Sequence, residues 1–169
     1  DTLKQLFESQ TSTIAYVLGS TFLMFVVLLR SFKLALLGLV PNVLAAASVI
    51  AVMGFLSIPL DMMTITIAAI TVGIAVDDTI HYIHRFQTEF KVDQNYLATM
   101  DRCHGSIGKA MYYTSVTITL GFSILALSEF MPTIYFGLLT GAAMIIALLG
   151  ALTLLPLLIV VFRPLPSHA

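Results

Sequence analysis

Long apolar stretches separated by short polar segments dominate the hydropathy pattern of this chain. A helix that crosses the hydrocarbon core of a bilayer needs about 20 mostly apolar residues. Five stretches meet this length, at residues 12–29, 34–56, 62–83, 110–127 and 132–162. The last one exceeds a single upright crossing, so we expect it to tilt or to bend near Pro156. The pattern predicts an all-α protein with a bundle of five transmembrane helices.

A sixth helical pattern lies in the polar segment between the third and fourth stretches. Apolar residues recur there at helical spacing, namely Tyr96, Leu97, Met100, Cys103 and Ile107. We expect an amphipathic helix over residues 93–106 that lies along the cytoplasmic membrane surface, with Asp93 as its N-cap and Gly105 as its end. The alternative is a solvated loop with incidental apolar residues.

Composition and charge agree with a membrane location. Hydrophobic residues make up 59% of the 169 residues and charged residues only 10%, compared with roughly 25% charged residues in soluble domains. The net charge of -1 gives no reason to expect a nucleic-acid partner, and a single cysteine excludes an intrachain disulfide. The chain begins with Asp1 and has no signal-peptide pattern, so we expect a segment of a longer polypeptide.

Lysine and arginine residues orient the predicted bundle. Seven of the eight lie in the connections that one side of the membrane would share: Arg30, Lys33, Arg85, Lys91, Arg102, Lys109 and Arg163. The connections at residues 57–61 and 128–131 contain none. Cytoplasmic connections are enriched in these residues. We therefore expect a multi-pass protein of the inner membrane with its C-terminus in the cytoplasm.

Two adjacent carboxylates, Asp77 and Asp78, interrupt the third apolar stretch. A charge at bilayer depth costs at least about 2.5–3.5 kcal/mol, and intramembrane ionisable residues therefore mark ion or proton pathways by default. Removal from water and a neighbouring negative charge both favour the neutral acid, so such a pair can take up and release a proton as a coupled unit. The alternative is a permanent pairing, to His81, Arg85 or another helix, that only holds the bundle together.

Helix geometry separates the two carboxylates. At 100° per residue, Gly73, Asp77, His81 and His84 share one stripe, whereas Asp78 points about 100° away. The stripe forms a possible proton relay toward the cytoplasm. In it, His81 is either a relay member or an orienting partner, and His84 is either a relay member or an ordinary interfacial histidine. A metal site on this stripe would have only three candidate ligands, so we predict no metal and no other cofactor.

Polar residues in other stretches are candidates for supporting roles. Thr114, Ser115 and Thr117 either face the carboxylates or donate to carbonyl groups of their own helix. Asn42 carries an amide that needs an interhelical partner inside a membrane. Both predictions depend on how the helices are rotated about their axes.

Glycines are candidates for close helix packing. Gly137 and Gly141 form a GxxxG step in the last stretch, a spacing that lets two helix backbones approach closely. We assign Gly73, on the stripe of Asp77, to the same role. None of these glycines is expected to take part in chemistry.

Several longer segments resemble a known family. They are LLRSFKLALLGLVPN, MGFLSIPLDMMT, GIAVDDTIHYIHRF, YYTSVTITLGF and LLPLL, preceded by Gln10, Thr11 and Ser12. Together they resemble the resistance-nodulation-division (RND) superfamily, and most closely its MMPL-like branch of hydrophobe exporters, which is related to proteins with sterol-sensing domains. The resemblance covers nearly the whole chain.

The resemblance implies a role and a set of partners. It implies that this chain is the five-helix block of one half of a transporter, more similar to the C-terminal half, and that it does not transport alone. It also implies proton-driven export of lipids or other hydrophobic compounds, with Asp77 and Asp78 on the positions of the proton-translocating carboxylates. The implied partners are membrane lipids, a hydrophobic substrate, the N-terminal half and an extracytoplasmic domain, assembled as a dimer or trimer.

Two other functions are compared with this one. A lipid-sensing or sterol-sensing membrane module without proton transport is the main alternative. An enzyme is not expected, because an intramembrane aspartyl protease needs two converging carboxylates, and neighbours on one helix diverge by about 100°.

Overall fold

Helices form nearly all of the described chain, which confirms the predicted all-α class. The computed structural model describes residues 2–58 and 62–165. Residues 59–61, part of the predicted connection at residues 57–61, lie outside the described residues. The elements are α1 (Thr2–Leu29), α2 (Phe32–Phe55), α3 (Met62–Asp93), α4 (Tyr96–Cys103), π-helical η1 (His104–Gly108), α5 (Lys109–Ser123), 3₁₀-helical η2 (Ile124–Leu127), α6 (Met131–Leu149), π-helical η3 (Gly150–Leu154) and α7 (Leu155–Phe162). Because η1, η2 and η3 continue their neighbouring helices, the described chain forms five long helices, as predicted.

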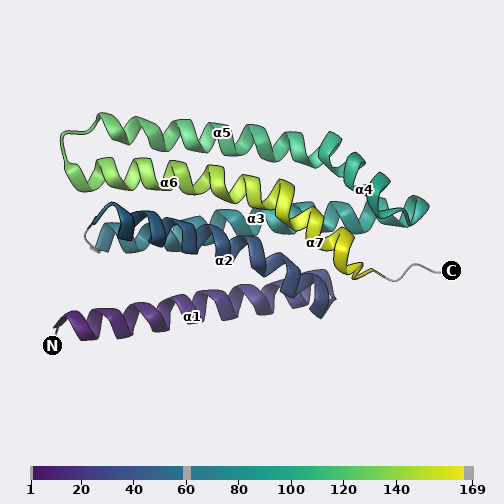
Figure 1. Ribbon diagram of the computed structural model, residues 1–169, viewed down its shortest axis with the longest axis horizontal. Coiled ribbons are helices and arrows are strands. Elements are labelled where there is room, and N and C mark those ends of the chain that lie inside the picture. The colour runs from purple at the N-terminus through teal and green to yellow at the C-terminus, as the bar shows by residue number, and fades with distance from the viewer. Residues whose placement is uncertain (1, 59–61, 166–169) are drawn as a thin grey trace.

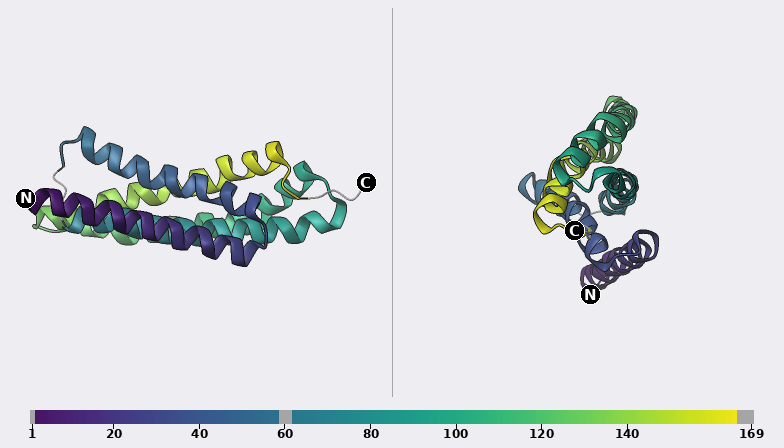
Figure 2. Two further views of the ribbon diagram at one scale, coloured as in Figure 1. Left: turned by 90° about the horizontal axis from the view of Figure 1, so that it is seen from below. Right: turned by 90° about the vertical axis from the view of Figure 1, so that its right-hand side faces the viewer.

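The five long helices lie side by side along one direction (Figure 1). α3 packs against α2 and α6, α5 packs against α6, and α1 packs against α2 and α3. In the end-on view of Figure 2, α1 and α5 lie at opposite edges of the bundle. The helix with the two carboxylates, α3, therefore lies near the middle of the bundle and has α2 and α6 as its main neighbours.

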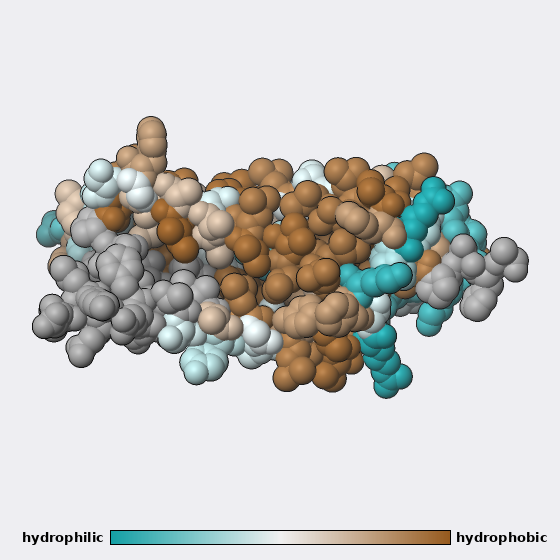
Figure 3. Space-filling view, turned by 60° about the horizontal axis from the view of Figure 1, so that its bottom comes forward, coloured by the Kyte–Doolittle hydropathy of each residue, from teal (hydrophilic) through white to brown (hydrophobic). Residues whose placement is uncertain are grey.

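The segments with most of the basic residues meet at one end of the bundle. The α1–α2 connection, the end of α3 with α4, and the end of α7 lie together at this end in Figure 1, and we call it the basic end. Figure 3 shows hydrophilic side chains there and hydrophobic ones along the middle. In the described part of the chain, three stretches are long and apolar enough to cross a membrane, Phe32–Phe55, Tyr96–Leu127 and Met131–Phe162. α1 adds a shorter apolar stretch, Ala15–Leu29.

Four helices end at a residue with a left-handed backbone that is not glycine. The φ angles are between 44° and 54° at Arg30, Ser57, Gln94 and Arg163. This conformation costs about 1–2 kcal/mol for a residue with a Cβ atom. The left-handed residue turns the chain, and its amide can donate to a free carbonyl group of the helix. The amide of Gln94, for example, donates to the carbonyl group of Phe90 at 2.9 Å.

The structure corrects the predicted end of the third span. α3 does not end at Ile83 but continues to Asp93. The reason is that Phe86 and Phe90 continue the apolar face at helical spacing and are buried in the main core cluster. The last turns of α3 thus reach beyond the apolar part of the bundle at the basic end.

The helix predicted over residues 93–106 also has different bounds. α4 begins at Tyr96, and its N-cap is Asn95, whose side-chain oxygen accepts from the amides of Leu97 at 3.1 Å and Ala98 at 3.3 Å. Gly105 does not end it but lies inside η1, which leads directly into α5. A glycine ends a helix when its φ is positive, and no described glycine has a positive φ.

The irregularity expected near Pro156 is the π-helical turn η3, which directly precedes α7. Pro156 has no N–H group and cannot bond to the carbonyl group of Leu152, four residues earlier. One ring nitrogen of His104 in η1 lies 2.8 Å from that oxygen, and the other lies 2.8 Å from the carbonyl oxygen of Met100. His104 therefore joins the two π-helical turns.

Candidate functional site

Asp77 and His81 form the polar part of an open face of α3. Oδ1 of Asp77 lies 3.4 Å from Nε2 of His81, and the two side chains are 72% and 61% exposed in this chain. A Cβ atom added to Gly73, one turn earlier, would meet nothing within 4 Å. We call Gly73, Asp77 and His81 the open stripe. A carboxylate and an imidazole at bilayer depth cannot stay against lipid without a large cost, so protein or water must cover this stripe in a membrane.

Asp78 lies on a different side of α3 from Asp77. Only 9% of it is exposed, and its polar side-chain partner is Ser115 on α5, which is itself buried. Asp77 and His81 are close enough to interact with it through their charges. The structure therefore places one carboxylate on the open stripe and the other inside the bundle, with a hydroxyl group beside it.

Asn42 of α2 contacts the residue that follows the carboxylate pair. Its Nδ2 donates to the carbonyl group of Gly38 at 2.8 Å and to Oγ1 of Thr79 at 3.3 Å. Thr79 in turn donates to the carbonyl group of Ala75 at 2.8 Å. Thr79 is thus the interhelical partner that Asn42 was expected to need. The sequence analysis does not predict this role of Thr79, although its place directly after Asp78 is a signal for it.

Thr114 and Thr117 donate to carbonyl groups of their own helix. Thr114 bonds to Ala110 at 2.5 Å and Thr117 bonds to Tyr113 at 2.8 Å, and both threonines are exposed. Of the three hydroxyl residues selected from α5, the structure therefore turns only Ser115 toward a carboxylate.

His84 and Arg85 lie closer to the basic end than the carboxylates do. Nη2 of Arg85 pairs with Oε1 of Glu89 at 2.8 Å, so this arginine does not neutralise Asp77 or Asp78. His84 is exposed and lines a cavity at the basic end. The residues of the predicted proton relay thus form a close pair, Asp77 and His81, and His84 lies separately one turn further along α3.

The two glycines of α6 face the end of α5. A Cβ atom on Gly137 would lie 2.5 Å from the carbonyl oxygen of Phe122 and 2.7 Å from Cβ of Leu125, so any other residue would force the helices apart. A Cβ atom on Gly141 would lie 3.6 Å from Thr119, which is ordinary van der Waals contact. Gly137 therefore sets the approach of α6 to α5, whereas Gly73 faces open space.

Long helices with an apolar surface and a carboxylate pair within the middle helix define a membrane domain of a polytopic protein. The family model of the MMPL family matches residues 2–165, so the chain belongs to this family. It is also similar to a protein of Methanocaldococcus jannaschii whose name describes a membrane protein, with 28% identity over 154 residues, which is 91% of this chain. The chain spans 40% of the length of that relative. These findings confirm the membrane class and the MMPL resemblance.

Proposed function

We propose that this chain is the membrane part of a proton-driven exporter of lipids or other hydrophobic compounds, in which Asp77 or Asp78 carries the proton. The observation that carries the proposal is the open stripe, where a carboxylate oxygen and an imidazole nitrogen lie 3.4 Å apart and both side chains are mostly exposed among the described residues. Ionisable groups in this position are expected along proton and ion paths rather than in purely structural roles. Membership in the MMPL family supports a transport function.

The partners of the two carboxylates suit reversible protonation. A serine hydroxyl donates to a carboxylate and accepts from a carboxylic acid, so Ser115 satisfies Asp78 in both states. His81 has the same property toward Asp77, because a ring nitrogen of imidazole acts as donor or acceptor.

The open stripe also supports a larger assembly. In transporters with two repeated halves, coupling sites lie at the interface between the halves. We propose that a second half covers Asp77 and His81, and that an extracytoplasmic domain completes the substrate path. The relative is longer than this chain, which spans 40% of its length. The basic end then faces the cytoplasm of a cell with an inner membrane, in agreement with the distribution of Lys and Arg.

Isosteric substitutions in the intact protein test the role of the carboxylates. The protein is reconstituted into vesicles made from the lipid extract of its host membrane, so that candidate substrates are present, and a trapped dye reports the decay of a pH gradient. Asp77→Asn, Asp78→Asn and the double variant remove one or two titratable groups with almost no change in volume. Asp101→Asn makes the same change on α4, outside the carboxylate site, and serves as the control.

The proposal expects proton flux to fall to the background level in the double variant and in at least one single variant. All variants should remain folded and monodisperse, and Asp101→Asn should keep the wild-type flux. Unchanged flux in the double variant would refute proton transport by these residues. Wild-type protein that binds lipid but never dissipates the gradient would instead favour a lipid-sensing module.

A further inference from the structure

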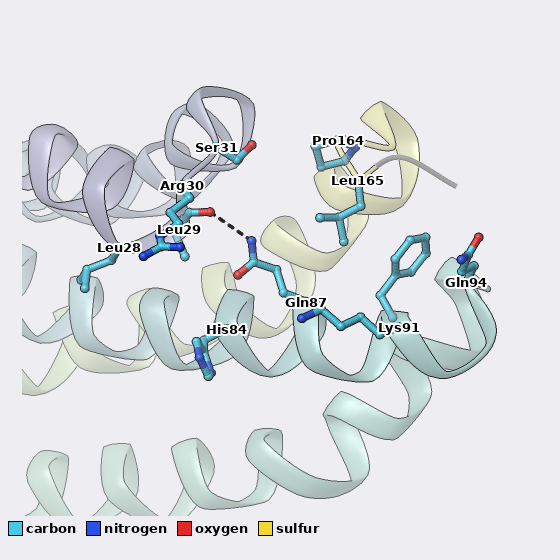
Figure 4. A pocket seen from close by; sticks show the side chains of 11 residues that line it. Leu28, Leu29, Arg30, Ser31, His84, Gln87, Lys91, Gln94, Pro164 and Leu165 are labelled. Carbon is cyan, nitrogen blue, oxygen red and sulfur yellow. Dashed lines mark hydrogen bonds between the residues drawn. The ribbon is translucent and has the colours of Figure 1, made fainter. Parts of the chain in front are cut away.

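A cavity at the basic end lies apart from the carboxylate site. Its volume is about 710 Å³, and it is bounded by the end of α1, the start of α2, the last turns of α3 and the residues after α7 (Figure 4). Leu28, Leu29, Phe90, Pro164 and Leu165 provide apolar walls. None of the eleven residues that line the cavity is acidic.

Two cations of this cavity have no acidic partner among the residues that the structure describes. Arg30 comes from the α1–α2 connection and Lys91 from α3, and both are exposed. None of the ion pairs within the described residues includes either of them, because the nearby acids Glu89 and Asp93 pair with other arginines. The cavity therefore carries uncompensated positive charge.

The start of α2 adds to this positive potential. Ser31, the N-cap of this 24-residue helix, lines the cavity, and its hydroxyl accepts from the amide of Leu34 at 3.4 Å. A helix N-terminus carries a partial positive charge and unpaired N–H groups. One wall of the cavity is the end of α1 and another is α3. Figure 4 shows a hydrogen bond between them, in which Gln87 of α3 donates to the carbonyl group of Leu29 at 3.2 Å. The cations thus lie on walls that are fixed relative to each other.

We infer that this cavity binds the phosphate headgroup of an anionic phospholipid. An arginine binds phosphate through two parallel N–H groups and a lysine acts as a point charge, so Arg30 and Lys91 supply both kinds of contact. The apolar walls accommodate the glycerol and the first methylene groups. Basic cavities between membrane helices on the cytoplasmic side are suited to such headgroups, whereas a free phosphate would leave the apolar walls without a partner. The inference does not depend on proton transport.

A lipid titration of the intact protein tests this site. The protein is purified in detergent, and native mass spectrometry measures its affinity for phosphatidylglycerol and for phosphatidylcholine with the same acyl chains. The variants are Arg30→Gln, Lys91→Gln and the double variant. Lys33→Gln is the matched control, because Lys33 is an exposed cation in the first turn of α2 that does not line the cavity. A thermal unfolding curve verifies the fold of each variant, and Lys91→Gln changes only an exposed helical position.

The affinity for phosphatidylglycerol should fall about fivefold for each single variant and about 25-fold for the double variant, at roughly 1 kcal/mol per cation near the membrane surface. The affinity for phosphatidylcholine and the behaviour of Lys33→Gln should stay at the wild-type level. An equal loss in Lys33→Gln, or no loss in the double variant, would overturn the site. A further test adds inorganic phosphate at millimolar concentration to the wild type and to the double variant. If it displaced phosphatidylglycerol from the wild type and had no effect on the double variant, that result would overturn the assignment to lipid in favour of a soluble phosphate.

Discussion

Charged groups in the middle of α3 and at the basic end have opposite surroundings. At the basic end, Arg102 donates to the carboxylate of Glu89 at 3.0 Å and to both carboxylate oxygens of Asp93 at 2.9 Å, and it also donates to the carbonyl group of Glu89 at 3.1 Å. On the open stripe, the one ion pair of Asp77 within the described part of the chain is with His81 at 3.4 Å, and both side chains are mostly exposed. The cluster of Arg102 is complete within this chain, whereas the open stripe is not.

The difference separates structural charges from candidate functional ones. A charge that only holds elements together is best served by fixed partners inside the fold, as in the link that Arg102 makes between α4 and the end of α3. A group that exchanges protons needs partners that tolerate both of its protonation states and a route to water. The open stripe suits the proposed proton exchange, and its exposed side chains indicate where another segment or a water path would cover it.

Larger residues in place of glycine should have the most different effects on stability at two places, the contact between α5 and α6 and the open stripe. Gly137→Leu places carbon atoms where the carbonyl group of Phe122 and the side chain of Leu125 already lie, so we expect a loss of about 3 kcal/mol or more in the free energy of unfolding. Gly141→Ala, which meets Thr119 only at van der Waals distance, should change it little. Thermal unfolding in detergent measures both variants.

Gly73→Leu completes this experiment on the open stripe. Because a Cβ atom at Gly73 would meet none of the described residues within 4 Å, the thermal stability of the domain should not fall. If a second half of the transporter covers the stripe, the larger side chain should block its approach and reduce proton flux in the intact protein. Wild-type flux in Gly73→Leu would show that no protein segment packs against this part of α3.

The sequence was sufficient for the main features of the fold. Hydropathy predicted five long helices, and the Lys and Arg distribution predicted the end at which the basic segments meet. The sequence did not predict the helix ends at Arg30 and Gln94. The surrounding structure imposes a left-handed backbone on these residues, whose own conformational preference is against it. Likewise, the sequence predicts a helix end at Gly105, whereas the backbone of this residue stays helical in η1.

The candidate site was predictable to a smaller extent. Helical periodicity was enough to place Asp77 and Asp78 on different sides of one helix. It could not tell that Ser115 turns toward Asp78 while Thr114 donates to its own helix, because this depends on how α5 is rotated relative to α3. The pairing of Asn42 with a neighbouring helix has the same origin.

A smaller effect is expected from the cluster at the basic end. Arg102→Gln removes the donors for two carboxylates and should lower the Tm of the protein by a few degrees, without abolishing proton flux. Arg102→Lys should recover only part of the Tm, because a lysine cannot bind two carboxylates in the planar geometry of a guanidinium group. Arg85→Gln removes a single pair within one helix and should have less effect. Loss of flux in a stably folded Arg102→Gln protein would contradict the division into structural and functional charges.

The smallest expected effect is a pH dependence at Asp93. Hydrogen bonds from Arg102, and then from the amide of Asn95, hold the pKa of Asp93 below its ordinary value of 3.8. Because the folded-state pKa is the lower one, this carboxylate stabilises the fold above about pH 3.8, and the contribution is lost as the pH falls through the folded-state pKa. Asp93→Asn should therefore flatten the decline of Tm with acidification below about pH 4. If the Tm of Asp93→Asn fell with acidification as it does in the wild type, Glu89 alone would hold Arg102. Asp93 would then add nothing to the stability of the cluster.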